Sequence, residues 1–208
     1  MGTRPLLEGV TARMERARSV GATGGSKERK TMRKLAIVVT LAVVLMGTLA
    51  TPSFAEHAGV KGEVTAHVSD LEEKLVGLAE AMPAEKFSWR PAEGIRSVSE
   101  VFMHIAGGNY FILNMAGAPP PSDVDAGGLE KNVTAKADVV AALKKSLTHT
   151  REAISKMSDA DLNKDLKLFG RESSNQGALL GVVVHMSEHL GQLIAYARMN
   201  GVTPPWSQ

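Results

Sequence analysis

The chain has 208 residues, of which 44% are hydrophobic and 22% are charged, a composition typical of one globular domain with an additional segment. It contains no cysteine, which excludes disulfides, a thiolate nucleophile and a cysteine-ligated metal site. The formal net charge of +2 conceals an imbalance, because residues 1–55 hold nine basic and three acidic side chains whereas residues 56–208 hold 15 and 19. The acidic balance of the longer part argues against binding to nucleic acid.

Residues 32–55 have the pattern of a signal peptide for export. Basic residues in 27–34 precede an apolar run over 35–50, and Ser53 and Ala55 stand at positions −3 and −1 of a cleavage site. We therefore expect cleavage after Ala55 and a periplasmic or extracellular location. The alternative is that the segment stays uncleaved as a membrane anchor, but the apolar run is shorter than the roughly 20 residues that a spanning helix needs.

Residues 1–31 show no sustained apolar periodicity. Because Met32 begins a conventional signal peptide, we expect translation to start there; the alternative is an unusually long basic region before the apolar run. Neither residues 1–31 nor the signal peptide is expected to contribute to the fold, which we assign to residues 56–208.

The segment 56–208 predicts an all-α fold, a four-helix bundle preceded by the signal peptide. Apolar residues recur at spacings of three and four in four stretches, which is typical of amphipathic helices. These stretches cover about 58–82, from Ser97 to near Gly117, from after Thr134 to about Met157, and from after Ser174 to Asn200. The apolar face of the second stretch is assigned to Val98, Val101, Phe102, Ile105 and Phe111.

Three further features bear on how these helices are arranged. Ser97 and Glu100 form a capping-box pattern at the start of the second helix, and Gly201 suits the position after the fourth. Residues 162–173 are expected to form a loop or short irregular structure, since no segment with a period of two competes with the helices. The link over about 118–134 is long enough to cross the bundle, so an up-down-up-down topology is not required.

Three histidines form the candidate metal site. His185 and His189 lie four residues apart on the fourth helix, which places both imidazoles on one face within reach of one divalent ion. His104 lies midway along the second helix, at a depth that matches the middle of the fourth. Three imidazoles from two facing helices would leave coordination positions open, as in reactive metal sites.

Several other polar residues lie near the expected site. Gln192 and Tyr196 extend the His185 and His189 face by one and two turns, so either could touch a ligand. Glu100, one turn before His104, is the best carboxylate candidate for a general base. It could instead accept a hydrogen bond from that histidine or act only in the capping box. His67 could be a fourth ligand. His149 is expected to be an exposed residue that takes no part.

The segment from about 60 to 207 resembles the DinB-like (YfiT-like) superfamily of bacterial four-helix-bundle metal proteins. The resemblance depends on four motifs taken in order: Phe87-Ser88-Trp89-Arg90-Pro91, Ser97 to Ile105, His185 to Leu193, and Tyr196-Ala197-Arg198 with Gly201 to Trp206. It implies that His104, His185 and His189 bind a divalent metal ion such as nickel, zinc, iron or manganese. Characterised members of this superfamily include thiol-dependent S-transferases and isomerases that use low-molecular-weight thiols. The export signal disfavours a thiol-transferase reaction here, because such thiols belong to the reducing cytoplasm.

These features lead us to expect a metal-dependent enzyme of hydrolase or transferase type that acts on a small molecule outside the cytoplasm. The ion would make water a nucleophile at neutral pH. Two alternatives remain: a non-catalytic metal- or ligand-binding module of the cell envelope, and a helical interaction domain with buried histidines. We expect no nucleic-acid partner and no membrane contact beyond an uncleaved signal segment, and the chain could form a homodimer.

Overall fold

The computed structural model describes residues 59–207. The predicted signal peptide at 32–55, its cleavage site and the segment 1–31 lie outside the described residues.

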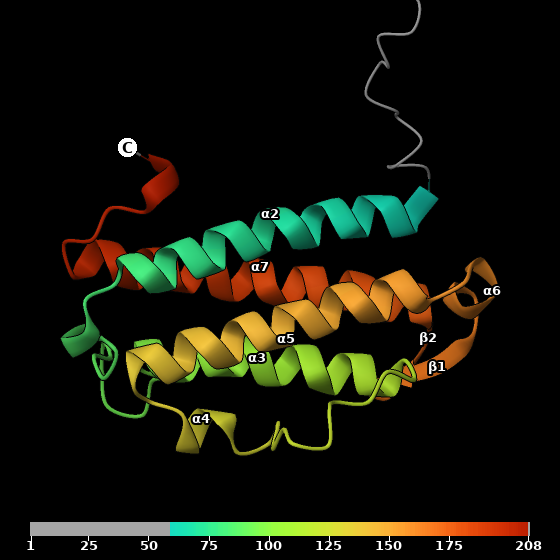
Figure 1. Cartoon of the computed structure of the whole chain (residues 1–208), viewed down its shortest axis with the longest axis horizontal. Helices are drawn as coiled ribbons and strands as arrows, with labels where there is room; N and C mark the ends of the chain where they lie inside the picture. Colours follow the sequence, from blue (N-terminus) through green and yellow to red (C-terminus); the bar gives the residue numbers. More distant parts are fainter. Residues whose placement is uncertain (1–58, 208) are drawn as a thin grey trace, which may run out of the picture. The chain divides into compact units, whose positions relative to one another are not determined.

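Four long helices form the described part of the chain, as the apolar periodicity predicts (Figure 1). Each long helix contacts two neighbours: α3 lies against α5 and α7, and α2 lies against the same two helices. Their bounds are Gly59–Ala81 for α2, Val98–Met115 for α3, Lys136–Lys156 for α5 and Asn175–Met199 for α7. The all-α, four-helix-bundle prediction is confirmed.

The bundle core consists of the apolar faces that the sequence predicts, with one exception. On α2, Val64, Val68 and Leu75 are almost completely buried, and the corresponding stripes of α3, α5 and α7 meet them. The exception is Phe111 of α3, which we had assigned to the buried face. It lies on the outside of the bundle with 55% of its surface exposed.

The link between α3 and α5 crosses the length of the bundle, as its length allows. In Figure 1 it leaves the C-terminal end of α3, runs back along the bundle and includes the one-turn helix α4 (Leu129–Asn132) before α5 begins. As a result α3 and α5 run parallel to each other, and α4 packs against α3. The topology is therefore not up-down-up-down.

A short β-hairpin replaces the loop expected over 162–173. Strands β1 (Asp165–Leu168) and β2 (Arg171–Ser174) pair antiparallel between α6 (Asp159–Leu162) and α7. The prediction that no two-residue period competes was wrong, because Asp165-Leu166-Lys167-Leu168 alternates polar and apolar side chains in the way a half-buried strand does. The other short elements are the 3-10 turns η2 (Ala84–Lys86) and η3 (Pro205–Ser207).

The segment before α3 fixes where that helix begins. Phe87 is buried and stacks on Phe102 of α3, with ring centroids 6.1 Å apart. The Phe87 and Trp89 carbonyls accept hydrogen bonds from the first backbone N–H groups of the helix, at 2.9 and 3.0 Å. The predicted capping box is present, since the Ser97 hydroxyl accepts from Glu100 and the Glu100 carboxylate accepts from Ser97. The rotation of α3, and with it the direction of its side chains, is set by these contacts.

Among residues 59–207, α7 is the one helix that is long and apolar enough to cross a membrane by length and composition. Its buried side chains belong to the bundle core and it packs against α2 and α3. The core thus accounts for its apolar character.

Removing the cap of α3 should destabilise the bundle. We expect Ser97→Ala to lower the free energy of unfolding by about 1 kcal/mol, because the Glu100 backbone N–H loses the Ser97 hydroxyl as its partner. Urea denaturation followed by circular dichroism measures the change. Ser69→Ala is a matched control, since the Ser69 hydroxyl is exposed and bonds only the preceding turn of α2. Equal stability of the two variants would contradict the role of the cap.

Candidate metal centre

The three predicted histidines meet between α3 and α7. His104 projects from α3, and His185 and His189 project from successive turns of α7. The three rings are 4.6 to 5.0 Å apart between centroids, and one nitrogen of each lies within 4.8 Å of the others. The i, i+4 spacing on α7 therefore does bring two imidazoles together, and α3 supplies the third. This group could hold a metal ion.

Glu130 of α4 fixes the orientation of His104. The Nδ1 atom of His104 lies 2.6 Å from the Glu130 carboxylate, which also accepts a hydrogen bond from the Arg96 guanidinium at 2.7 Å. Burial raises the pKa of Glu130, but the hydrogen bonds from Arg96 and His104 outweigh it and leave the pKa below its usual range. An ionised Glu130 holds the proton of His104 on Nδ1, so the Nε2 lone pair remains available.

A second chain of hydrogen bonds fixes His189. Its Nδ1 atom lies 2.9 Å from the Gln192 side-chain oxygen, and the Gln192 amide donates to the Tyr196 hydroxyl at 2.9 Å. That hydroxyl donates to the backbone carbonyl of Arg96 at 3.2 Å, and the Tyr196 ring packs edge-on against Trp89. Gln192 and Tyr196, expected to touch a ligand, thus act through His189 and leave its Nε2 atom free.

His185 occupies a space that a glycine opens. A Cβ atom on Gly108 of α3 would lie only 2.2 Å from the Cε1 atom of the His185 ring, so any other residue at 108 would displace the ring. The Nδ1 atom of His185 is buried and has no hydrogen-bond partner among the described residues. Burial lowers the pKa of His185 to about 4, and the positive charges of the nearby Arg96 and of protonated His104 and His189 act in the same direction. Its imidazole is therefore neutral at pH 7.

The residues present fit a divalent metal ion. Burial also lowers the pKa of His104, an effect that the hydrogen bond to Glu130 partly opposes. His104 and His185 are thus neutral near pH 7, the form of imidazole that binds a metal. Two of the three rings are held through Nδ1 by an acceptor, the arrangement common to histidine ligands in metal sites. Imidazole nitrogens suit zinc, iron, nickel and similar ions.

Two other residues considered from the sequence do not join the histidine group. Both carboxylate oxygens of Glu100 are engaged elsewhere, one by the Ser97 backbone N–H at 2.7 Å and one by Arg90 at 3.0 Å. These hydrogen bonds, led by the one from Ser97, hold the pKa of Glu100 below its usual range. The capping-box interpretation of Glu100 is the one that the structure supports. His67 is exposed on α2 and does not belong to the group.

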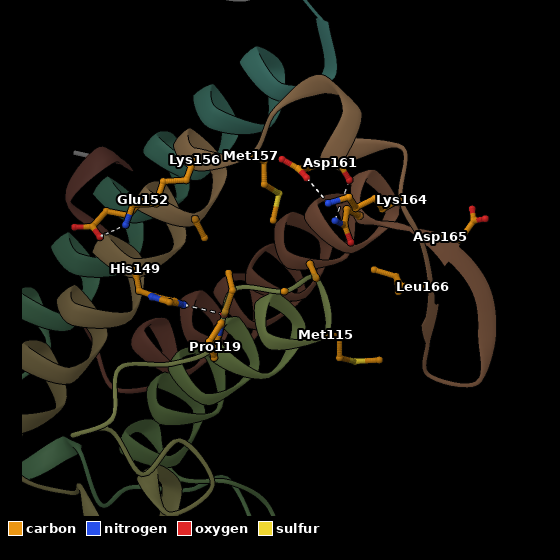
Figure 2. A pocket seen from close by; sticks show the side chains of 15 residues that line it. Met115, Pro119, His149, Glu152, Lys156, Met157, Asp161, Lys164, Asp165 and Leu166 are labelled. Carbon is orange, nitrogen blue, oxygen red and sulfur yellow. Dashed lines mark hydrogen bonds and ion pairs between the residues drawn. The ribbon is translucent and has the colours of Figure 1, made fainter.

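His149 lies at a separate cavity of about 600 Å³ near the C-terminal ends of α3 and α5 (Figure 2). We had expected it to be exposed, but it is half-buried, with its ring 5.1 Å from that of Tyr110 and Nε2 3.3 Å from the Ala118 carbonyl. Two ion pairs line the same cavity, Glu152 with Lys156 and Asp161 with Lys164. Its charges largely neutralise one another, and none of the three clustered histidines lines it.

A comparison of the sequence with known protein families identifies the family of this chain. A sequence profile described as the DinB superfamily matches residues 67–193. The chain belongs to the DinB superfamily. The matched range includes His104, His185 and His189.

Solved structures of DinB-like proteins share the fold. A DinB-like protein from Bacillus cereus aligns with a TM-score of 0.61 at 23% identity, over 68% of this chain and 93% of its own. A DinB-like protein from Bacillus subtilis gives 0.55 at 22% identity, over 68% and 93%. A DinB family member from Exiguobacterium sibiricum gives 0.55 at 23% identity, over 69% and 93%. A comparison with functionally curated proteins gave no significant match.

Sequence reasoning missed Glu130 and Arg96. Glu130 is 26 residues from His104, on a helix of four residues that has no periodicity to detect. A signal was available, however, because Glu130 is an acidic side chain in a link expected to cross the bundle. Pairing that acid with the histidine of α3 would have required the path of the link, which the sequence does not provide.

Replacing Gly108 should separate metal affinity from stability. We expect Gly108→Ala to weaken metal binding by at least about tenfold, because the new methyl group displaces the His185 ring. Stability should hold or rise, since alanine favours a helix more than glycine does. Calorimetric titration with Zn²⁺ and thermal denaturation measure the two effects.

Gly191→Ala is the matched control for this substitution. Gly191 also lies within a helix, α7, but a Cβ atom there meets nothing within 4 Å. The control should keep the metal affinity of the unmodified protein. Equal metal affinity in the Gly108 and Gly191 variants would show that the close approach at Gly108 does not position His185.

Proposed function

We propose that this DinB superfamily protein is an exported metal-dependent enzyme of hydrolase or transferase type that acts on a small molecule. The observation that supports it best is the convergence of three imidazoles, with one nitrogen of each within 4.8 Å of the others. Three protein ligands leave coordination positions for a substrate, which is typical of catalytic rather than structural sites. A bound divalent ion supplies Lewis acidity, which polarises carbonyl or phosphoryl oxygens and acidifies water.

The roles of the surrounding residues follow from their contacts. His104, His185 and His189 hold the ion. Glu130 keeps the proton of His104 on Nδ1, and Gln192 does the same for His189, so both rings present Nε2. We therefore treat Glu130, Gln192 and Tyr196 as positioning residues.

Arg96 adds a positive charge at the edge of the site. Its guanidinium is 43% exposed and holds Glu130 with one side, and its charge lowers the pKa of both His104 and His185, after the larger effect of burial. A cation at this place favours an anionic group on the substrate or a negative charge that develops during the reaction.

Export is the second part of the proposal, and it is supported by the signal-peptide pattern of residues 32–55. The acidic balance of residues 56–208 gives no support to a nucleic-acid substrate.

The metal ligands can be tested one by one. We expect His104→Ala and His185→Ala each to remove most bound metal, because two imidazoles hold a divalent ion far more weakly than three. Gln192→Ala should weaken metal binding by roughly 10- to 100-fold, as the loss of an orienting partner does. His67→Ala is the control and should keep full metal content. Elemental analysis of protein purified from its native compartment gives the result.

Turnover tests the enzyme part of the proposal on the same variants. Ester hydrolysis and thiol transfer are screened with the metal-loaded protein, with the His185→Ala variant as the background. Activity that requires the three histidines supports the proposal. Bound metal with no activity across both reaction classes would favour a non-catalytic metal-binding module instead. Full metal content in His104→Ala would contradict the site itself.

Cleavage of the signal segment is expected after Ala55. Mass spectrometry of the protein from its native host should show a chain that begins at Glu56. An N-terminus upstream of Met32 would contradict the expected start of translation. A mature protein that keeps residues 35–50 would indicate a membrane anchor.

A further inference from the structure

Two aromatic side chains stack on each other at the surface of the bundle. Phe111 of α3 is 55% exposed, and Phe169, at the tip of the β-hairpin, is 66% exposed. Their ring centroids are 6.0 Å apart and their planes differ by 29°. Large apolar groups left in water cost free energy, and covering the exposed sides of this Phe111–Phe169 pair would recover it.

Helix spacing relates the pair to the histidine group. The His185 ring packs against Gly108, and Phe111 follows Gly108 by three residues, so it is the next side chain along the same face of α3. The hairpin also lies close to α7. A Cβ atom on Gly181, four residues before His185, would lie 3.5 Å from the Leu168 side chain of the hairpin. Leu168 directly precedes Phe169. Both helices therefore place the aromatic pair about one helical turn from His185.

The backbone at Phe169 is in a conformation that phenylalanine disfavours. Phe169 has a φ of 50° and Gly170 a φ of 79°, and the two join the paired residues Leu168 and Arg171. Such two-residue turns favour Asn-Gly, because both positions need a positive φ. A bulky side chain there is strained by an amount on the order of 1 kcal/mol. Neither backbone preference nor burial explains the phenylalanine; the contact that the structure shows is the stacking on Phe111, and the exposed side of both rings faces solvent.

We propose that the Phe111–Phe169 pair binds an apolar group of the substrate. This inference rests on the proposed metal-dependent function and specifies its substrate class: a polar, metal-binding group joined to an aromatic or branched hydrocarbon group. The opposite side of the site is polar and charged, with Glu130, Arg96 and Gln192 around His104 and His189. A ligand with one polar and one apolar end matches both sides.

A small ligand fits the pair better than a second copy of the chain does. An aromatic side chain offers on the order of 150–250 Å², and Phe111 and Phe169 are 55% and 66% exposed here. A stable protein interface needs about 800 Å² from each partner. The exposed part of two rings is far smaller than that, but it is sufficient to cover one phenyl group.

The test compares two probes that bind a metal through the same atom. Protein loaded with Co²⁺ is titrated with imidazole and with 4-phenylimidazole, and the visible absorption of the ion reports when each probe coordinates it. We expect 4-phenylimidazole to bind at least about tenfold more tightly, because its phenyl group is removed from water on the aromatic pair. Calorimetric titration of the metal-free protein should show no binding of either probe.

Substitution of the pair should remove this preference without weakening the metal site. In the variant Phe111→Ala with Phe169→Asn, the two probes should bind within about threefold of each other, and imidazole should bind as in the unmodified protein. Phe169→Asn alone should also raise the melting temperature, because asparagine suits the turn. Loss of preference together with a gain in stability is not expected of a residue with a merely structural role. Met199→Ala, which removes a 65% exposed side chain at the end of α7, should keep the preference.

Four results would overturn the inference. These are equal affinities of the two probes for the unmodified protein, an unchanged preference in the double variant, a preference that persists without metal, and self-association that the double variant abolishes in sedimentation. The last would assign the pair to an interface between two copies of the chain. If the protein binds no Co²⁺, the proposed function fails and this inference fails with it. If Co²⁺ binds and the preference is missing, only this inference fails.

Discussion

The close approach of α3 and α7 at Gly108 is the contact on which the histidine group depends. A side chain at that position would occupy the space of the His185 ring, so the absence of a Cβ atom lets one helix supply the surface on which a histidine of the other lies. Glycine inside a helix costs roughly 0.5–1 kcal/mol relative to alanine. The bundle carries that cost at the place where three imidazoles must come within a few ångströms of one another.

The parts of the chain outside the long helices give the three rings their orientation. Glu130 comes from a single helical turn in the crossing link, and Arg96 comes from the segment before α3. The carbonyl of Arg96 ends the hydrogen-bond chain from His189, and its guanidinium holds the glutamate that orients His104. One residue thus connects the supports of two histidines on different helices, so movement of the segment before α3 would disturb both rings together.

Much of the bundle and two members of the histidine group could be predicted from local patterns. The four amphipathic stretches, the capping box of Ser97 and Glu100, and the i, i+4 pair on α7 all depend on neighbours within one or two helical turns. Glu130 could not be assigned in this way, because its partner is 26 residues away and only the path of the link brings them together. Phe111 was misplaced because it belongs to the apolar residues of an amphipathic stretch, and nothing local indicates that its ring lies outside the bundle against the tip of the hairpin. The hairpin itself was missed because four-residue strands carry a weak periodic signal.

The order of the helices along the chain also affects when the site can form. His104 and His185 are 81 positions apart in the chain, and the three-histidine group is incomplete until α7, the last long helix, has packed against α3. A chain that crosses a membrane unfolded would therefore pass through the cytoplasm without an assembled binding site. The ions available in the compartment where folding finishes, and not those present during synthesis, would then determine which metal the protein acquires.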